Sequence, residues 1–277
     1  MAVPIAGAVV LAVAAAGFTH LGYSFPARSE PLRGTHVELR IQDGVSAREL
    51  KAIRDGVLLV DRYLNRSLRR GVGHPVEARV ARQDRCRRSE SGERSLIGQA
   101  SAGFLCVDTA NIEWKVLMSG DRAAVTAVSG HEYVHVWQAD LGCLPSGDRR
   151  DYRWIVEGMA MHLAWEALVR AGLATEARVR RTIRLEGDFD SNTEPLRTYE
   201  HEGGRPPQYA LWHLAIRKLA REAAANGAAP RAKPTVALRA FCARIGAGLP
   251  WRAAFLRSFG LSVEEFYARF EAARPGS

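Results

Sequence analysis

The sequence predicts an α+β fold, with strands in the first part of the chain and helices throughout the second. Short stretches that alternate apolar and polar residues come before residue 120, as half-buried strands require. Apolar residues at helical spacing follow, and two capping-box sequences, Ser46–Glu49 and Ser262–Glu265, mark helix starts. With 277 residues, 47% of them hydrophobic, the chain can form one large domain or two closely packed lobes.

Residues 1–27 are expected to be a signal peptide or an N-terminal membrane anchor. Residues 2–18 carry no charge and are rich in Ala, Val and Leu, which is typical of an export segment. The first basic residue, Arg28, follows this run, whereas signal peptides usually have a basic residue before it. Cleavage near Ala27 and an uncleaved anchor both stay open. Either favours a secreted, periplasmic or membrane-anchored protein over one with a buried N-terminal helix.

Residues 28–34, which contain Pro31 and Gly34, are expected to be a linker, and the folded domain is expected over 35–273. Its first lobe, 35–150, should contain a helix that starts after Ser46 and runs to Leu68. Strands are expected at 36–41, 76–81, 103–107 and 112–116. The second lobe, 151–273, should be helical, with a helix around Glu157 that runs to about Arg170, helices near 208–224, 235–245 and 251–259, and a last one after Ser262.

The H-E-x-x-H sequence His131–His135 predicts a metal site. An i, i+4 spacing puts both histidines on one helical face, so both imidazoles can bind one ion. Zinc lowers the pKa of a bound water, and Glu132 can then take its proton. Mostly apolar flanks indicate a buried helix, for which Asp121 is a candidate N-cap. The alternative is a surface helix that carries two histidines and a glutamate by chance.

A third protein ligand is expected from Glu157. The other common pattern, with a glycine and a third histidine after the motif, is excluded because Gln138 and Leu141 occupy those positions. Glu157 lies among apolar residues at the start of an expected helix, Trp154 to Ala160. A buried carboxylate without a partner would be costly there, and a metal ion would explain it.

H-E-x-x-H followed by W-x-x-E-G-x-A resembles the gluzincin zinc peptidases, in particular the bacterial peptidase MA-like domains. The resemblance covers residues 35–273 and is strongest in the two ligand helices. It implies a zincin-like fold, with the H-E-x-x-H helix beside a small twisted sheet and an all-helical C-terminal lobe. Zinc would be bound by His131, His135 and Glu157.

The resemblance also implies a mechanism of peptide hydrolysis. Glu132 would be the general base, and Tyr209 would stabilise the oxyanion, with His213 and His201 as alternatives. The edge strand beside the active-site helix would hold the substrate, and the candidate is the hairpin 103–116, which could equally be an ordinary internal strand. Met161 departs from the family, because thermolysin-like members have an aspartate there that supports a zinc histidine.

Cysteine and charge patterns limit the remaining options. The spacing of the four cysteines does not fit a Cys-x-x-Cys zinc site. Cys86 and Cys106 are expected to form a disulfide across a loop between strands. The pairing of Cys143 and Cys242 stays open, and free thiols are the alternative to disulfides. His36 and His74 are expected to be structural. The formal charge of +9 permits contact with anionic surfaces, acidic peptides or cell-wall polymers, and no nucleic-acid-binding module is found.

The predicted function is therefore an exported zinc metallopeptidase that acts on a peptide or protein. Membrane attachment could occur through the apolar N-terminus. One alternative is a zinc-bearing scaffold that binds peptides with little or no turnover, which the departure at Met161 favours and Glu132 opposes. Another is an envelope interaction protein without a metal. The sequence leaves substrate specificity and oligomeric state open.

Overall fold

A computed structural model describes residues 27–82, 86, 98–120, 122–144, 151–186, 194–200 and 206–274. The expected export segment before residue 27, the candidate N-cap Asp121 and the candidate donor His201 lie outside these ranges. Among the helices within them, none combines the length and the apolar character needed to cross a membrane.

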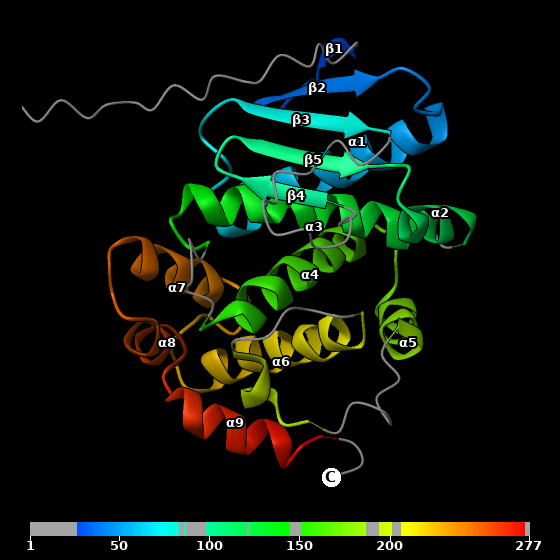
Figure 1. The fold of residues 1–277 in the computed structure, drawn as a ribbon. Coiled ribbons are helices and arrows are strands. Elements are labelled where there is room, and N and C mark those ends of the chain that lie inside the picture. Colours follow the sequence, from blue (N-terminus) through cyan, green and yellow to red (C-terminus); the bar gives the residue numbers. More distant parts are fainter. Residues whose placement is uncertain are drawn as a thin grey trace, which may run out of the picture.

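The strands of the described residues form one five-stranded mixed sheet in the order β1-β2-β3-β5-β4 (Figure 1). Its inner pairs, β2 with β3 and β3 with β5, are parallel, and its outer pairs are antiparallel. The strands are β1 (Ala27–Pro31), β2 (Val37–Gln42), β3 (Val76–Ala81), β4 (Gly98–Ser101) and β5 (Phe104–Asp108). Both β1 and β4 are therefore edge strands of the sheet.

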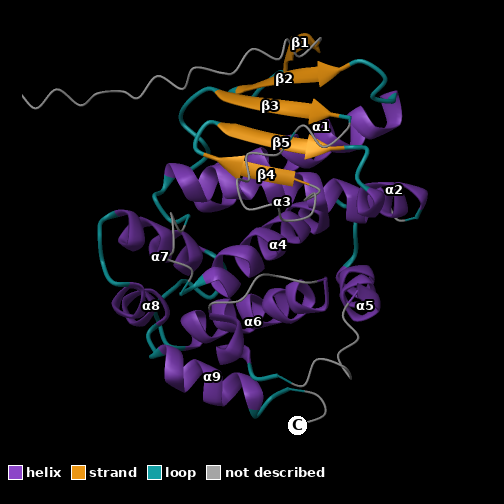
Figure 2. Ribbon diagram, in the orientation of Figure 1, coloured by secondary structure: helices purple, strands orange, loops and turns teal. Residues whose placement is uncertain are grey.

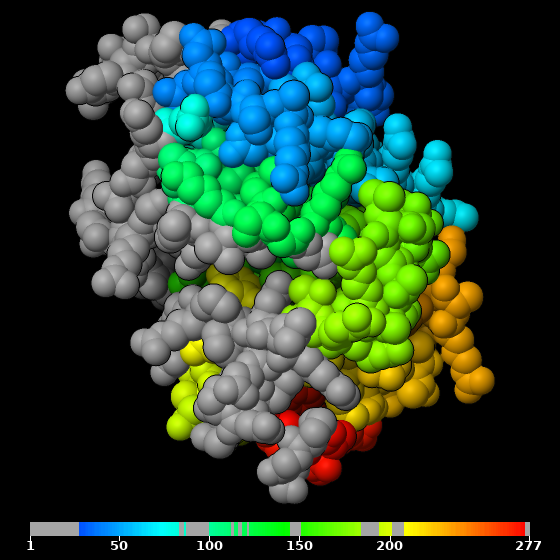
Figure 3. Space-filling view, turned by 90° about the vertical axis from the view of Figure 1, so that its right-hand side faces the viewer, coloured from blue at the N-terminus to red at the C-terminus, as the bar shows by residue number. Residues whose placement is uncertain are grey.

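Helices pack against one side of the sheet and fill the rest of the molecule (Figure 2). In the sheet-containing part they are α1 (Ala47–Tyr63), which continues as a π-helical turn η1 (Leu64–Leu68), α2 (Ile112–Ser119) and α3 (Arg122–Asp140). The second part contains α4 (Arg153–Arg170), α5 (Glu176–Glu186), the 3₁₀ turn η2 (Leu196–Glu200), α6 (Pro206–Ala225), α7 (Val236–Gly246), α8 (Trp251–Phe259) and α9 (Val263–Glu271). Figure 3 shows the first part, blue to green, lying against the second.

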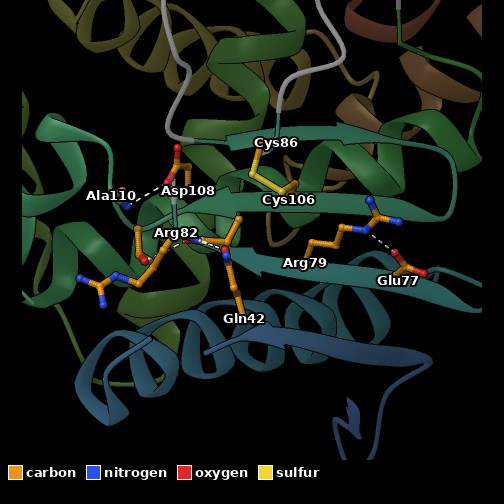
Figure 4. Close-up of a disulfide and its surroundings, with 10 residues drawn as sticks. Gln42, Glu77, Arg79, Arg82, Cys86, Cys106, Asp108 and Ala110 are labelled. Atoms are coloured by element: carbon orange, nitrogen blue, oxygen red, sulfur yellow. Dashed lines mark hydrogen bonds and ion pairs between the residues drawn. A yellow bond between two sulfur atoms is a disulfide. The ribbon is translucent and has the colours of Figure 1, made fainter. Parts of the chain in front are cut away.

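Side-chain alternation explains which face of the sheet is covered by helices. In β5, Leu105 and Val107 are fully buried in the main core, and the alternate residues Phe104 and Cys106 lie in a separate small cluster. Cys86 joins this cluster through a disulfide with Cys106, with their Cα atoms 5.5 Å apart (Figure 4). The expected Cys86–Cys106 pairing is thus confirmed, and it covers the face of the sheet away from the helices.

Helix α3 lies at the centre of the molecule and packs closely on α1. Gly56 and Gly130 make this possible, because a Cβ at Gly56 would lie 2.4 Å from the Thr126 carbonyl oxygen and one at Gly130 would lie 2.7 Å from Val60. The Tyr133 hydroxyl donates a 2.8 Å hydrogen bond to Asp61 on α1. Helix α4 packs on α3 as well, since Ala164 would lie 3.5 Å from the same Gly130 Cβ.

Helix α4 is in turn held by the C-terminal helices. A Cβ at Gly158 would lie 2.7 Å from the Trp212 carbonyl oxygen of α6, so glycine permits the close approach of these two helices. At the start of α4, the Trp154 indole donates to the Tyr267 hydroxyl, which donates to the buried Glu200 carboxylate. A second disulfide joins Cys143, after α3, to Cys242 on α7, with Cα atoms 4.7 Å apart.

The mixed α+β class is confirmed, as are the helix around Glu157, which ends at Arg170, and both capping boxes. Two local predictions are wrong. Ala27–Pro31, assigned to the end of the export segment and to the linker, forms β1, because Ala27 to Pro31 pair antiparallel with Gln42 to Glu38. Ile112–Val116 is not a strand but the first part of α2, since five alternating residues are too few to exclude helical periodicity.

The expected hairpin 103–116 is also wrong in its extent. The hairpin consists of β4 and β5, with Gly103 at positive φ (68°) in the turn between them. Its edge strand is β4, which lies beside α3 (Figure 1). The Ser- and Gly-rich composition before residue 98 concealed where this strand begins.

Candidate metal centre

The structure brings His131 and His135 of α3 together with Glu157 of α4. The two Nε2 atoms are 2.9 Å apart, and Glu157 Oε2 lies 3.2 Å from each. Both histidines are buried, and the Glu157 side chain is 15% exposed. Among the described residues, this is the one group of three or more ligand-type side chains arranged to hold a metal ion.

The donor set and its dimensions fit zinc. A triangle with sides of 2.9, 3.2 and 3.2 Å has its centre about 1.8 Å from each corner, so an ion about 2.0–2.2 Å from all three atoms can be accommodated just above the plane. Two imidazole nitrogens and one carboxylate oxygen are also the set that catalytic zinc commonly takes from proteins. The geometry therefore supports the three ligands expected from the sequence.

Gln138 orients one of the histidines, a role that the sequence analysis missed. Its Nε2 donates a 2.9 Å hydrogen bond to the Val156 carbonyl oxygen of α4, so its Oε1 must be the atom that faces His135 Nδ1, at 2.7 Å. His135 therefore keeps a proton on Nδ1, and Nε2 is the nitrogen that can bind a metal once its own proton is displaced. The sequence shows only a polar residue in an apolar stretch one turn after the second histidine, which does not by itself indicate a contact with His135.

Met161, at the position where the resemblance implies an aspartate that supports a zinc histidine, does not support His131. Met161 is partly buried and packs with Trp165 and Leu168 in a separate apolar cluster. His131 Nδ1 is buried and has no hydrogen-bond partner among the residues that the structure describes. Gln138 therefore orients His135 through a hydrogen bond, whereas Met161 offers no hydrogen bond to His131.

Charges within the cluster complement one another. Burial lowers the pKa of His135, but the Glu157 carboxylate outweighs burial and raises this pKa to about 9. Burial raises the pKa of Glu157, but His135 and His131 together hold it well below its usual range. Glu157 is thus an anion at neutral pH, as a metal ligand must be.

Glu132 adjoins the cluster from the same helix. Its side chain is buried, and burial is the largest of the effects that raise its pKa above the usual value, partly offset by His131 and His135. A carboxylate with a raised pKa can both accept and release a proton at moderate pH. This property suits the general base expected from the sequence.

Tyr209 on α6 packs beside His131. The Tyr209 ring centroid is 5.9 Å from that of His131 and 5.2 Å from that of Trp212. Burial, and then the negative charge of Glu157, raise the pKa of its hydroxyl. Tyr209 is therefore protonated at neutral pH and can donate a hydrogen bond beside the cluster.

The alternative donor His213 points elsewhere. Its ring packs on that of His162, with centroids 5.3 Å apart, in a small cavity lined by Glu176 and Arg217 among others. His36 is exposed, and His74 pairs with Asp140 at 3.2 Å. None of His213, His162, His36 and His74 belongs to the metal-ligating group.

Comparison with known proteins adds no assignment. The chain matches no protein-family model, and no curated protein is significantly similar to it. Any functional conclusion consequently depends on the site itself.

Proposed function

We propose that this protein is a zinc-dependent peptidase of the gluzincin type. The observation that supports this most strongly is the meeting of His131, His135 and Glu157 from two helices, with ligand atoms 2.9–3.2 Å apart. A chance H-E-x-x-H sequence on a surface helix would not place its histidines in the core against a carboxylate. The three side chains would hold zinc, which when bound polarises a carbonyl and lowers the pKa of water.

The residues around the ligands have complementary roles in this proposal. Glu132 takes a proton from the attacking water and delivers one to the leaving amine. Tyr209 donates a hydrogen bond to the substrate oxygen that gains negative charge. Gln138 keeps His135 in the tautomer that leaves its Nε2 lone pair available.

The position of β4 supports an extended peptide as the substrate. This strand is at the edge of the sheet and lies beside α3, so its unpaired main-chain groups are near the ligand helix. An extended chain can add to such an edge by main-chain hydrogen bonds. We propose β4, in place of the hairpin 103–116, as the substrate-binding strand.

Two disulfides support an exported location for this activity. Cys86–Cys106 and Cys143–Cys242 account for all four cysteines. Disulfides of this kind persist in oxidising compartments. Together with the uncharged residues 2–18, they favour action outside the cytoplasm.

A zinc-bearing scaffold without turnover is the second candidate. His131 Nδ1, which has no partner within the described part of the chain, favours it, because a ligand that no neighbouring group orients binds metal more weakly. Against it, a scaffold has no evident use for a buried glutamate at position 132.

Metal analysis combined with hydrolysis tests the proposal. Protein purified without added zinc should contain about one zinc per chain and cleave an unstructured polypeptide such as casein. Chelation should abolish cleavage, and added zinc should restore it. Bound zinc without cleavage would favour the scaffold, and protein that binds no zinc would exclude both candidates.

A further inference from the structure

A groove of about 440 Å³ lies between α1, the start of α3 and the junction of α4 with α5. It shares no residue with the candidate metal centre. Its apolar part includes four leucines, which are Leu58, Leu59, Leu168 and Leu173. Basic side chains line it as well, namely Lys51, Arg62, Arg122 and Arg178. Figure 3 shows the side of the molecule on which α5 lies.

Leu173 is held in an exposed position by the end of α4. Gly172 turns the chain with φ at 72°, and the Leu173 amide donates a 3.0 Å hydrogen bond to the Leu168 carbonyl oxygen. The Leu173 side chain is 50% exposed, and Leu256 is the other large hydrophobic residue found exposed in the described part of the chain. An exposed leucine that adjoins further leucines in a groove favours contact with an apolar partner.

The basic residues of the groove favour an anionic partner. All four are exposed, and Asp55 is the one carboxylate among the lining residues. Its Oδ2 atom lies 3.1 Å from both Lys51 Nζ and Arg122 Nη2, so two cations share one negative charge and the lining stays positively charged. Arg180 and Arg181, which are exposed on α5, add to the positive charge of this side. The partner should therefore combine negative charge with an apolar part.

The described chain begins near the helix that supplies part of this lining. Ala27 pairs with Gln42 at the end of β2, and α1 begins five residues later at Ala47. Lys51 of the groove follows one helical turn after Ala47. The uncharged residues 2–18, which precede Ala27 in the sequence, are the expected signal peptide or membrane anchor. This order favours a partner in a membrane over one in solution.

We propose that the groove is a docking surface for a membrane that contains anionic phospholipids. Its basic side chains contact the lipid phosphates, and Leu173 reaches the boundary of the acyl chains. An anionic phospholipid bilayer offers both negative charge and apolar chains to one surface of a protein. The inference goes beyond the proposed peptidase activity and does not depend on it.

The test attaches a nitrobenzoxadiazole fluorophore to Leu173→Cys and, as a control, to Leu256→Cys, both in the full chain. All four native cysteines are in disulfides, so the introduced thiol is the one labelled. Leu256 is 51% exposed, lies on α8 and is not part of the groove. The label at position 173 should brighten and shift to shorter wavelength with vesicles of equal parts phosphatidylcholine and phosphatidylglycerol, and not with phosphatidylcholine alone. The label at position 256 should respond to neither, even where the apolar N-terminus attaches the chain to the vesicle.

Charge substitutions separate docking at the groove from attraction by the net charge. Arg62→Gln with Arg178→Gln removes two charges from the lining, and Arg231→Gln with Arg257→Gln removes two exposed charges elsewhere. The first pair should weaken the response at position 173 to anionic vesicles about 10-fold or more, since each basic residue near an anionic surface contributes to binding. The control pair should change it little.

Several results would overturn the docking surface. They are a silent label at position 173, equal responses at positions 173 and 256, equal responses to neutral and anionic vesicles, and equal losses in the two charge pairs. A response at position 173 that grows with protein concentration in the absence of lipid would also overturn it, because a second copy of the chain would then cover the groove.

Discussion

Gln138 and His135 lie three residues apart on α3, with Gln138 Oε1 2.7 Å from His135 Nδ1. The carboxamide cannot turn over, because its amino group is engaged by the Val156 carbonyl oxygen of α4. One side chain thus links the two ligand-bearing helices and determines which nitrogen of His135 is available to a metal.

This link predicts opposite results for two substitutions. Gln138→Leu should weaken zinc binding about 10- to 100-fold, because His135 loses its orienting acceptor. Gln138→Glu keeps an acceptor for His135 Nδ1 and should retain zinc affinity, while losing stability because it cannot donate to Val156. Competition with a chromophoric chelator measures the affinities. Equal affinity in Gln138→Leu and wild type would exclude the orienting role.

Zinc binding should release a proton at neutral pH. The pKa of His135 in the metal-free protein is about 9, because Glu157 outweighs the effect of burial, so His135 is protonated at pH 7. Zinc needs the Nε2 lone pair and must displace this proton, so affinity should rise with pH up to about 9. Calorimetry in buffers of different ionisation enthalpy counts the protons. A pH-independent affinity between 7 and 9 would contradict this charge assignment.

Acid should destabilise the contact between α4 and α6. Burial, with Arg217 adding to it, lowers the pKa of His162 to about 4, and the pKa of His213 is lowered in the same direction. The unfolded chain therefore binds more protons below pH 6.5, and stability should fall by about 3 kcal/mol between pH 6.5 and 4 from His162 alone. Urea unfolding of metal-free His162→Gln should show a flatter pH profile, while exposed His36→Gln should not.

The Cys143–Cys242 disulfide should contribute substantially to stability because it closes a long loop. It closes a sequence separation of 99 residues and joins the end of α3 to α7. Replacing both cysteines by alanine should lower the free energy of unfolding by about 2–4 kcal/mol, chiefly by freeing the unfolded chain. Denaturant unfolding checks this value. A loss below that of the Cys86–Cys106 double replacement, which spans 20 residues, would contradict the ranking.

Strand and helix periodicity predicted the elements whose pattern is complete within their own residues. The strand β3 and the helix α8 match their expected bounds because alternation and helical spacing are explicit there. In contrast, β1 depends on pairing with β2, and nothing in Ala27–Pro31 itself indicates this partner. The helix α2 was missed because its first five residues alternate.

The candidate site was predictable to the extent that it follows helical spacing. The pair His131 and His135 has a fixed spacing, and Glu157 could be found as a carboxylate among apolar residues. Gln138 could not be found in this way, because its role depends on how α3 and α4 cross.

The central claim is tested most directly by measuring zinc content and peptide hydrolysis on Glu132→Gln and His135→Ala. Glu132→Gln keeps the size of the side chain and all three ligands, so zinc should stay near one per chain while hydrolysis falls about 10²- to 10⁴-fold. His135→Ala removes a ligand, so zinc occupancy and thermal stability should both fall. Full activity in Glu132→Gln, or stoichiometric zinc in His135→Ala, would contradict the peptidase mechanism.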